Sequence, residues 1–290
     1  RHALQDCGIF VLLGLVRLFT VYLLSYQHHV TEYGVHANFF FTLAFLKVSC
    51  IWPLRLSGTF SSLLFAVFVG LVHQLCLSSL NWDMWVLGNA PRDTFLAANR
   101  EFVVSLPGYV ELYILGASLG MFKFKRSRNG NLWKPLLTIL FIGGIMLVTA
   151  NTYLEAPSRR LANPTFVIWA MFFFVFFLVQ SALIEEALRN ILPGHFCSPI
   201  LFQAINRRPL LFFLLANVVT GIINLLINTL TISYVTGVVI IAMYSCTLSY
   251  IMYFLFYKID ILIRQSEKRR VEEKEKGNEN KDNKDKRKEE

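Results

Sequence analysis

Charged residues are scarce in this sequence, and the sequence motifs of common soluble enzymes are missing. Only 16% of the 290 residues are Asp, Glu, Lys or Arg, whereas 55% are hydrophobic. No GxSxG elbow, P-loop, GxGxxG or HExxH motif occurs. The five cysteines are scattered and include no CxxC pair, so their spacing indicates neither a disulfide framework nor a zinc site. We therefore expect no bound metal and no resident cofactor.

Long apolar runs take up most of the chain. Stretches of about 20 residues recur, which is the length that a helix needs to cross a hydrocarbon core of roughly 30 Å. They are longer than the strands of a membrane barrel and do not alternate in polarity, so the backbone is expected to be helical. The sequence predicts an all-α polytopic membrane protein. Its eight expected spans are 8–26, 37–52, 59–78, 105–122, 135–153, 165–184, 209–230 and 233–257.

The two ends of the chain differ from this membrane region. The sequence begins at Arg1 without a Met, and we expect a fragment of a longer protein. Residues 1–257 are predicted to form one transmembrane domain. Residues 258–290 contain almost no apolar side chains and are predicted to form a charged, disordered tail.

Basic residues set the predicted orientation. If the tail is cytosolic, the cytosolic segments hold ten Lys and Arg residues before the tail, and the opposite face holds Arg92, Arg100, Arg159 and Arg160. The net charge of +9 then reflects topology, and nucleic acid is not an expected partner. This orientation places 27–36, 97–109 and 151–163 together on the non-cytosolic face.

The first candidate site lies in the segment "QHHVTEYGVHAN". If a helix begins there, His28, Glu32 and His36 share one face, with His29 nearly opposite His36. Such a group can bind metal, act as an acid–base centre or orient a polar headgroup. An interfacial loop whose polar residues mark the edge of the membrane explains the same pattern, and Gly34 weakens the helical argument.

Two further polar segments lie on the same predicted face. Arg100 can bind phosphate with its planar guanidinium, and it can equally be an ordinary interfacial arginine. Arg100 and Glu101 are adjacent, so no facing helical pair is expected between them. Pro107 and Gly108 predict an irregular backbone just after this segment. Arg159 and Arg160 are explained equally well by a phosphodiester ligand and by an ion pair with Glu155.

Polar side chains also occur inside the spans. Asn217, Asn224 and Asn228 are spaced to form one helical stripe, for which contact between helices is favoured over contact with substrate. Glu111 and Arg17 lie within spans, where charges are functional hypotheses by default. From the residues alone, the chain is a membrane enzyme or transporter with a polar, non-cytosolic cluster.

Four segments, in this order, resemble a known family. "YQHHVTEYGVHANFFFTL", "AANREFVVSLPGY", "LEAPSRRLAN" and "AINRRPLLFFLLANVVTGIINLLINTL" are similar to the GPI inositol acyltransferases over roughly residues 1–255. The resemblance implies transfer of a fatty acyl chain, typically palmitoyl, from acyl-CoA to the inositol 2-hydroxyl of glucosaminyl-phosphatidylinositol. It also implies a multi-pass protein of the endoplasmic reticulum membrane, with the polar loops lumenal and the tail cytosolic.

The resemblance supplies candidate roles. His29 or His36, oriented by Glu32, is the candidate base, because the acceptor alcohol must lose a proton. The candidate substrate-binding residues are His28, Asn38, Asn99, Arg100, Glu101, Arg159, Arg160, Asn163, Asn217 and Asn224. The family also has spans upstream of the matched region, so the alternative is that the catalytic pair lies before Arg1. A transporter or lipid scramblase, and a non-catalytic fragment of the acyltransferase, are the competing functions.

Overall fold

The protein is described by a computed structural model that covers residues 2–23, 30–56, 59–126, 133–191, 200–229 and 231–266. Every regular element in these ranges is a helix, which confirms the all-α prediction. Six helices are long and apolar enough to cross a membrane, and two more apolar helices, Cys7–Leu23 and Phe39–Ser49, are shorter. Each of the eight predicted spans falls on one of these eight helices. The chain divides into two compact units, 1–191 and 192–290.

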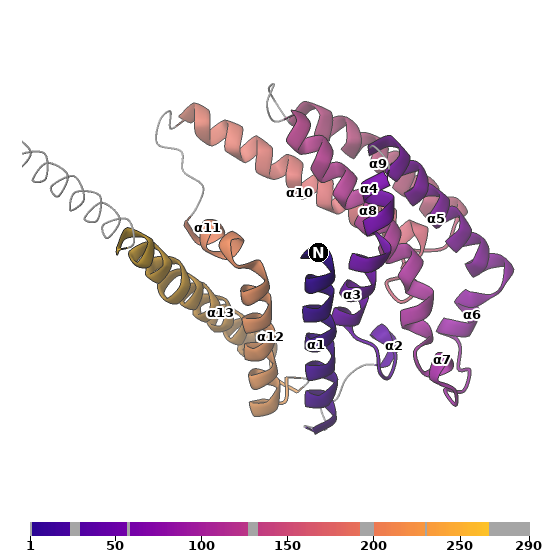
Figure 1. The fold of residues 1–290 in the computed structure, drawn as a ribbon, viewed down its shortest axis with the longest axis horizontal. Helices are drawn as coiled ribbons and strands as arrows, with labels where there is room; N and C mark the ends of the chain where they lie inside the picture. Colours follow the sequence, from indigo (N-terminus) through magenta and orange to yellow (C-terminus); the bar gives the residue numbers. More distant parts are fainter. Residues whose placement is uncertain are drawn as a thin grey trace, which may run out of the picture. The chain divides into compact units, whose positions relative to one another are not determined.

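The described residues of the first unit form ten helices in order along the chain (Figure 1). They are α1 (His2–Leu23), α2 (Val30–Tyr33), α3 (Phe39–Ser49), α4 (Ile51–Leu56), α5 (Thr59–Ser79), α6 (Trp82–Leu87), α7 (Phe95–Ala98), α8 (Arg100–Arg126), α9 (Trp133–Tyr153) and α10 (Pro164–Ile191). Three helix pairs make the most extensive contacts: α5 with α8, α1 with α3, and α9 with α10. Helix α8 also contacts α2, α3, α6, α7 and α10, so it is the centre of this unit.

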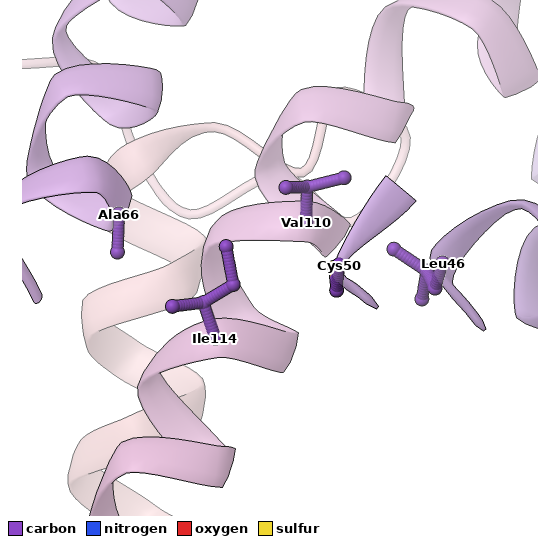
Figure 2. Close-up of a cluster of buried hydrophobic side chains, with 5 residues drawn as sticks. All are labelled: Leu46, Cys50, Ala66, Val110 and Ile114. Carbon is purple, nitrogen blue, oxygen red and sulfur yellow. The ribbon is translucent and has the colours of Figure 1, made fainter. Parts of the chain in front are cut away.

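Apolar side chains join α8 to its neighbours. Val110 and Ile114 of α8 meet Ala66 of α5, together with Leu46 and Cys50 at the end of α3 (Figure 2). A second cluster lies nearer the start of α8, where Val104 packs with Leu77 of α5, Val86 of α6 and Leu161 of the loop between α9 and α10. Large apolar side chains are meanwhile exposed along the outer faces of α5, α9 and α10. This distribution suits a helix bundle that is surrounded by hydrocarbon.

Helix α8 differs from the prediction at its start. It begins at Arg100 rather than at 105 and continues through Pro107 without a break, so the expected irregular backbone at Pro107–Gly108 is wrong. Proline lacks the N–H that would bind the carbonyl of Val103. Membrane helices tolerate such a loss where neighbouring helices surround the site. The consequence is that Arg100 and Glu101 belong to the first turn of a spanning helix.

The second unit contains α11 (Ile200–Arg207), α12 (Pro209–Leu226), α13 (Tyr234–Ile251) and a π-helix, η1 (Met252–Lys258). Tyr257 of η1 donates a hydrogen bond to Gln203 Oε1 of α11 at 3.1 Å, and Arg207 lies 4.7 Å from the Tyr257 ring centroid. Helical backbone continues to Ser266, beyond the predicted boundary at 257. The rest of the predicted tail lies outside the described residues.

Helix α12 carries only part of the predicted asparagine stripe. It ends at Leu226, so Asn228 lies beyond the helix and the three-residue stripe is wrong at that position. Asn217 donates from Nδ2 to Phe213 O in its own helix at 2.8 Å, and Asn224 Oδ1 accepts from Thr229 Oγ1 at 3.2 Å. Both residues belong to the second unit, and their substrate-binding role stays a prediction.

Candidate functional site

The predicted helix over 28–36 is interrupted in the structure. Helix α2 ends at Tyr33, and Gly34 follows with a φ of 96°, which favours glycine. A Cβ on Gly34 would also lie 2.6 Å from Asn99 Cα, so a larger residue has no room there. Glu32 therefore lies on α2 and His36 lies in the bend after it. The expectation that they share one helix face is wrong.

Asn38 ends this bend and begins the next helix. Its Oδ1 accepts from the N–H groups of Phe40 and Phe41 at 3.0 and 3.3 Å, which caps α3. Its Nδ2 donates to Gly14 O of α1 at 3.0 Å. The buried Asn38 side chain thus fixes α3 against α1, and its predicted contact with substrate is untested.

Asn99 holds the bend from the opposite side. Its Oδ1 accepts from the backbone N–H groups of His36 and Ala37 at 2.8 and 3.1 Å. Its Nδ2 donates to Phe95 O at 2.9 Å and lies 3.3 Å from His36 Nδ1. The His36 ring also stacks on Phe95, with centroids 5.6 Å apart. Asn99 is almost fully buried, so these bonds set the position of the His36 backbone and ring together.

A buried carboxylate, Glu101, is the second centre of the site. Its side chain is 0% exposed, and three arginines surround it. Arg92 contacts it with Nη2–Oε1 at 2.5 Å and Nη1–Oε2 at 3.0 Å. Arg160 Nη2 lies 3.4 Å from Oε1, and Arg100 Nε lies 3.8 Å from the same atom. The hydrogen bond to the Glu101 carboxylate raises the pKa of Arg92.

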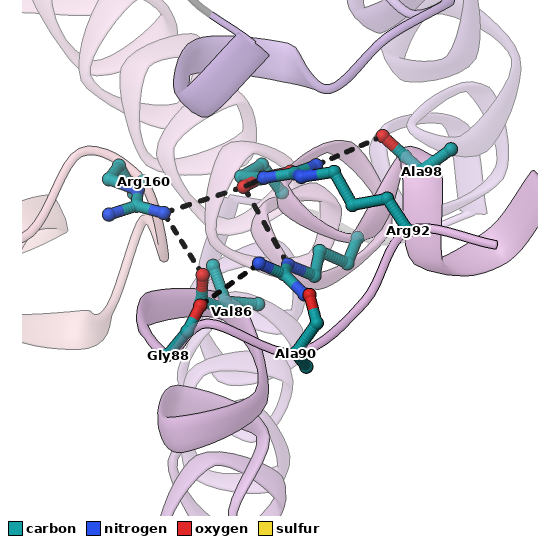
Figure 3. Close-up of polar contacts among 8 residues, drawn as sticks. Val86, Gly88, Ala90, Arg92, Ala98 and Arg160 are labelled. Carbon is teal, nitrogen blue, oxygen red and sulfur yellow. Dashed lines mark hydrogen bonds and ion pairs between the residues drawn. The ribbon is translucent and has the colours of Figure 1, made fainter.

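The same arginines bind main-chain carbonyls around this carboxylate (Figure 3). Their acceptors are Ala98 for Arg92 at 3.2 Å, Ala90 and Gly88 for Arg100 at 2.8 and 3.0 Å, and Val86 for Arg160 at 3.0 Å. The segment between α6 and α7 is therefore tied to the first turn of α8 and to the loop before α10. Adjacent Arg100 and Glu101 do approach each other to 3.8 Å, contrary to the sequence argument, while Arg100 Nη1 and Nη2 bind the carbonyls of Ala90 and Gly88.

The loop between α9 and α10 is organised by Asn163. Its Oδ1 accepts from the N–H groups of Ser158 and Phe166 at 3.0 and 3.1 Å, and its Nδ2 donates to Ala156 O at 3.0 Å. The loop lies against α8 so closely that a Cβ on Gly108 would overlap the carbonyl oxygen of Ala162. This contact holds the paired arginines of the loop beside α8.

The two adjacent arginines have different partners. Arg160 points to Glu101, whereas Arg159 makes an exposed ion pair with Glu32 at 3.3 Å and donates a hydrogen bond from Nη2 to Tyr33 Oη at 3.3 Å. The hydrogen bond with Tyr33 raises the pKa of Arg159. Glu155 instead accepts from Gln74 Nε2 at 3.4 Å, so the proposed pairing of Glu155 with these arginines is wrong.

Two pockets flank the 34–38 bend. A polar pocket of about 60 Å³ is lined by Arg17 of α1 together with Glu32, Tyr33 and Asn38. An apolar pocket of about 420 Å³ lies beside His36 and Asn99, and its size falls within the roughly 300–1,000 Å³ of small-molecule sites. Its other lining residues are Leu18, Ala37, Phe41, Phe95, Leu96, Phe102 and Val103.

Most predicted site residues of the first unit are therefore brought together. Glu32, His36, Asn38, Asn99, Arg100, Glu101, Arg159, Arg160 and Asn163 all lie in the loops and first turns around α8. His28 and His29 lie outside the described residues, and their roles stay predictions. The sequence reasoning missed Arg92 as a site residue, although its position on the face with few basic residues was a signal. The sequence marks Arg17 only as a charge within a span and does not assign it to the site.

A comparison with known protein families identifies the family of this chain. The profile of the family described as GWT1 matches residues 1–255, which include every element of the site. The chain belongs to the GWT1 family. This result confirms the family resemblance that the four sequence segments predicted.

Individual curated proteins are similar to the chain over most of its length. The chain is 35% identical over 238 residues to "GPI-anchored wall transfer protein 1" of Schizosaccharomyces pombe, covering 79% of this chain and 52% of that protein. It is 31% identical over 269 residues to "Glucosaminyl-phosphatidylinositol-acyltransferase PIGW" of Homo sapiens, covering 79% and 53%. It is 31% identical over 233 residues to "Phosphatidylinositol-glycan biosynthesis class W protein" of Dictyostelium discoideum, covering 79% and 46%. The chain spans about half the length of these curated relatives.

Proposed function

We propose that this chain is the part of a membrane acyltransferase that binds glucosaminyl-phosphatidylinositol and a fatty acyl-CoA. The acyl chain, palmitoyl in the simplest case, is transferred to the inositol 2-hydroxyl during GPI-anchor synthesis. The observation that carries this proposal is the match, over 79% of the chain, to a human protein whose name specifies glucosaminyl-phosphatidylinositol acyltransfer. The proposed location is the endoplasmic reticulum membrane, with the site loops lumenal and the C-terminal tail cytosolic.

The charge distribution of the site supports an anionic headgroup. Three guanidinium groups surround one carboxylate at Glu101, so positive charge is in excess there. Arg92 and Arg160 remain partly accessible, with side chains 26% and 33% exposed. Guanidinium groups are well suited to bind phosphate oxygens through paired hydrogen bonds. The phosphodiester of the lipid acceptor is the ligand that this arrangement fits.

The two pockets support a polar headgroup of the lipid that accepts the acyl group and an apolar chain of the acyl-CoA that donates it. The small pocket presents Arg17, Glu32 and Asn38, which can bind hydroxyl groups of a sugar or inositol ring. The larger pocket is lined mainly by aliphatic and phenylalanine side chains, which suits a fatty acyl chain. In the reaction, the thioester C–S bond breaks and a C–O ester bond forms. The hydroxyl proton is lost from the acceptor, and the thiolate of CoA leaves as the thiol.

Acyl transfer is tested with the full reading frame that contains this chain, expressed in membranes without endogenous activity. Labelled palmitoyl-CoA and glucosaminyl-phosphatidylinositol are supplied, and the acylated lipid is measured. We expect labelled product with the wild type and with Gly116→Ala, because a Cβ at Gly116 meets nothing within 4 Å. Absence of product from the wild-type reading frame overturns the proposal, and so does movement of intact lipid across the membrane without acylation. The same assay on this chain alone shows whether it suffices.

A further inference from the structure

The orientation of the Asn99 amide is fixed by groups that can only donate. Backbone N–H groups of His36 and Ala37 both point at one end of the side chain, at 2.8 and 3.1 Å, so that end is the oxygen. The NH₂ end then faces Phe95 O at 2.9 Å and His36 Nδ1 at 3.3 Å. An exchange of oxygen and nitrogen would set two N–H donors against an NH₂ group and place the amide oxygen against the Phe95 carbonyl.

This orientation determines the tautomer of His36. An amide NH₂ group has hydrogens and no lone pair to offer, so His36 Nδ1 must accept and carries no proton. In the neutral ring the proton is consequently on Nε2. Nε2 has no hydrogen-bond partner among the described residues. His36 is an exposed residue, and its imidazole therefore offers one N–H donor that no described residue of the chain uses.

The surroundings of the ring indicate what that donor binds. His36 lines the 420 Å³ apolar pocket and stacks on Phe95, whereas the charged groups of the site lie around Glu101 and Arg159. A ligand for this position has an acceptor oxygen at the end of an apolar chain. We propose that His36 Nε2–H donates a hydrogen bond to the carbonyl oxygen of the fatty acyl group, and that Asn99 is the positioning residue that holds it in this tautomer.

This inference rests on the proposed acyltransferase function and revises the role of His36 within it. Nε2–H has no free lone pair, so neutral His36 does not take the proton from the acceptor hydroxyl. It instead stabilises the negative charge that develops on the carbonyl oxygen when the hydroxyl oxygen adds to the thioester carbon. The electron pair on this oxygen forms the C=O bond again when the C–S bond breaks. The base is a different group from His36.

The tautomer is measured directly by ¹⁵N NMR of the histidine ring nitrogens in the full chain, at a pH well above the usual imidazole pKa. The chain has six histidines, and the signals that disappear in His36→Gln identify His36. We expect a protonated Nε2 and an unprotonated Nδ1. Asn99→Asp should reverse this pattern, because a carboxylate accepts from Nδ1–H. A protonated Nδ1 in the wild type, or an unchanged tautomer in a folded Asn99→Asp variant, overturns the assignment.

The ligand is tested with two stable analogues of palmitoyl-CoA that differ at the carbonyl. One replaces the thioester by a ketone, which keeps the oxygen, and the other is a thioether, which lacks it. We expect the wild type to bind the ketone up to about tenfold more tightly, as one hydrogen bond provides. His36→Ala should remove this preference, and His36→Gln, which retains an N–H donor, should keep part of it.

The outcomes separate this inference from the proposed function. If the wild type binds both analogues equally, the carbonyl contact is wrong even though acyl-CoA binding stands. If the wild type binds neither analogue, the acyl-CoA part of the proposed function fails and the carbonyl contact fails with it. A ketone preference that survives in His36→Ala assigns the carbonyl donor to another residue and overturns the proposal.

Discussion

Arg92 donates hydrogen bonds from both terminal guanidinium nitrogens to the carboxylate of Glu101, at 2.5 and 3.0 Å. The two residues are nine positions apart in the chain. The carboxylate is fully buried at the start of α8, and Arg160 reaches it from the loop before α10. One ionised side chain thus holds two separate loops against a spanning helix. The arrangement depends on this carboxylate more than on any single arginine, because each arginine also binds a backbone carbonyl.

Removal of the Glu101 carboxylate should strongly destabilise the first unit. Glu101→Ala leaves three partly or fully buried guanidinium groups without their counter-charge, and loss of one partner from a buried pair costs about 3–5 kcal/mol. The measurement is thermal or denaturant unfolding in detergent. The matched control is Glu32→Ala, which removes an ion pair whose side chains are 56% and 48% exposed and should cost less than about 1 kcal/mol. Equal losses in the two variants would contradict this account.

Gly108 should tolerate no side chain. A Cβ there overlaps the carbonyl oxygen of Ala162, which is backbone and cannot rotate away. We expect Gly108→Ala to displace the α9–α10 loop and to lower the yield of folded protein and its unfolding temperature. Gly116→Ala in the same helix is the control, and it should be neutral or stabilising by up to about 1 kcal/mol, since alanine is the better helix former. A stable Gly108→Ala variant would show that the loop does not press against α8 in this way.

Gly70 and Glu111 should be energetically coupled. A Cβ on Gly70 of α5 would lie 2.7 Å from both carboxyl oxygens of Glu111 on α8. We expect Gly70→Ala to destabilise the wild type and to be tolerated in a Glu111→Ala background, giving a non-additive double-mutant cycle. Unfolding in detergent of the four variants measures the coupling. Additive effects would mean that the two helices do not meet at this pair.

The orientation of the loops in the membrane is a separate prediction. Labels placed in the 154–158 segment should be accessible from the non-cytosolic side, and labels in the C-terminal tail from the cytosolic side, because basic residues favour the cytosolic side. Single introduced cysteines and a membrane-impermeant thiol reagent on oriented vesicles make this measurement. Labelling of both segments from the same side would overturn the proposed topology.

The sequence predicted the fold well where apolar length decides the structure. Runs of about 20 apolar residues located all eight long or shorter apolar helices, since a membrane leaves few alternatives for such runs. It did not predict α6 and α7, which are short and are held by bonds with distant residues. The carbonyl of Ala98 at the end of α7 accepts from the N–H of Val35, and the carbonyls of Val86 in α6 and of Gly88 just after it accept from Arg160 and Arg100. Local patterns contain no information about such partners.

The sequence predicted which segments form the site, but not which side chains pair within it. The segments around His36, Asn99 and Arg160 do meet, as their shared membrane face predicted. The partners within the site depend on how separate loops pack, so the pairing of Glu155 with the arginines and the shared face of Glu32 and His36 were wrong. The contact between Asn99 and His36 joins residues 63 positions apart, and spacing along one helix could not reveal it.

The most direct test of the central claim is to locate a photoreactive palmitoyl-CoA bound to the full reading frame. With a diazirine on the acyl chain, irradiation followed by mass spectrometry of the protein identifies the residues that contact it. The account predicts covalent labels on pocket residues beside His36, such as Phe41, Phe95 and Phe102, and competition by unlabelled palmitoyl-CoA. Labels confined to other parts of the protein, with none in this pocket, would contradict it.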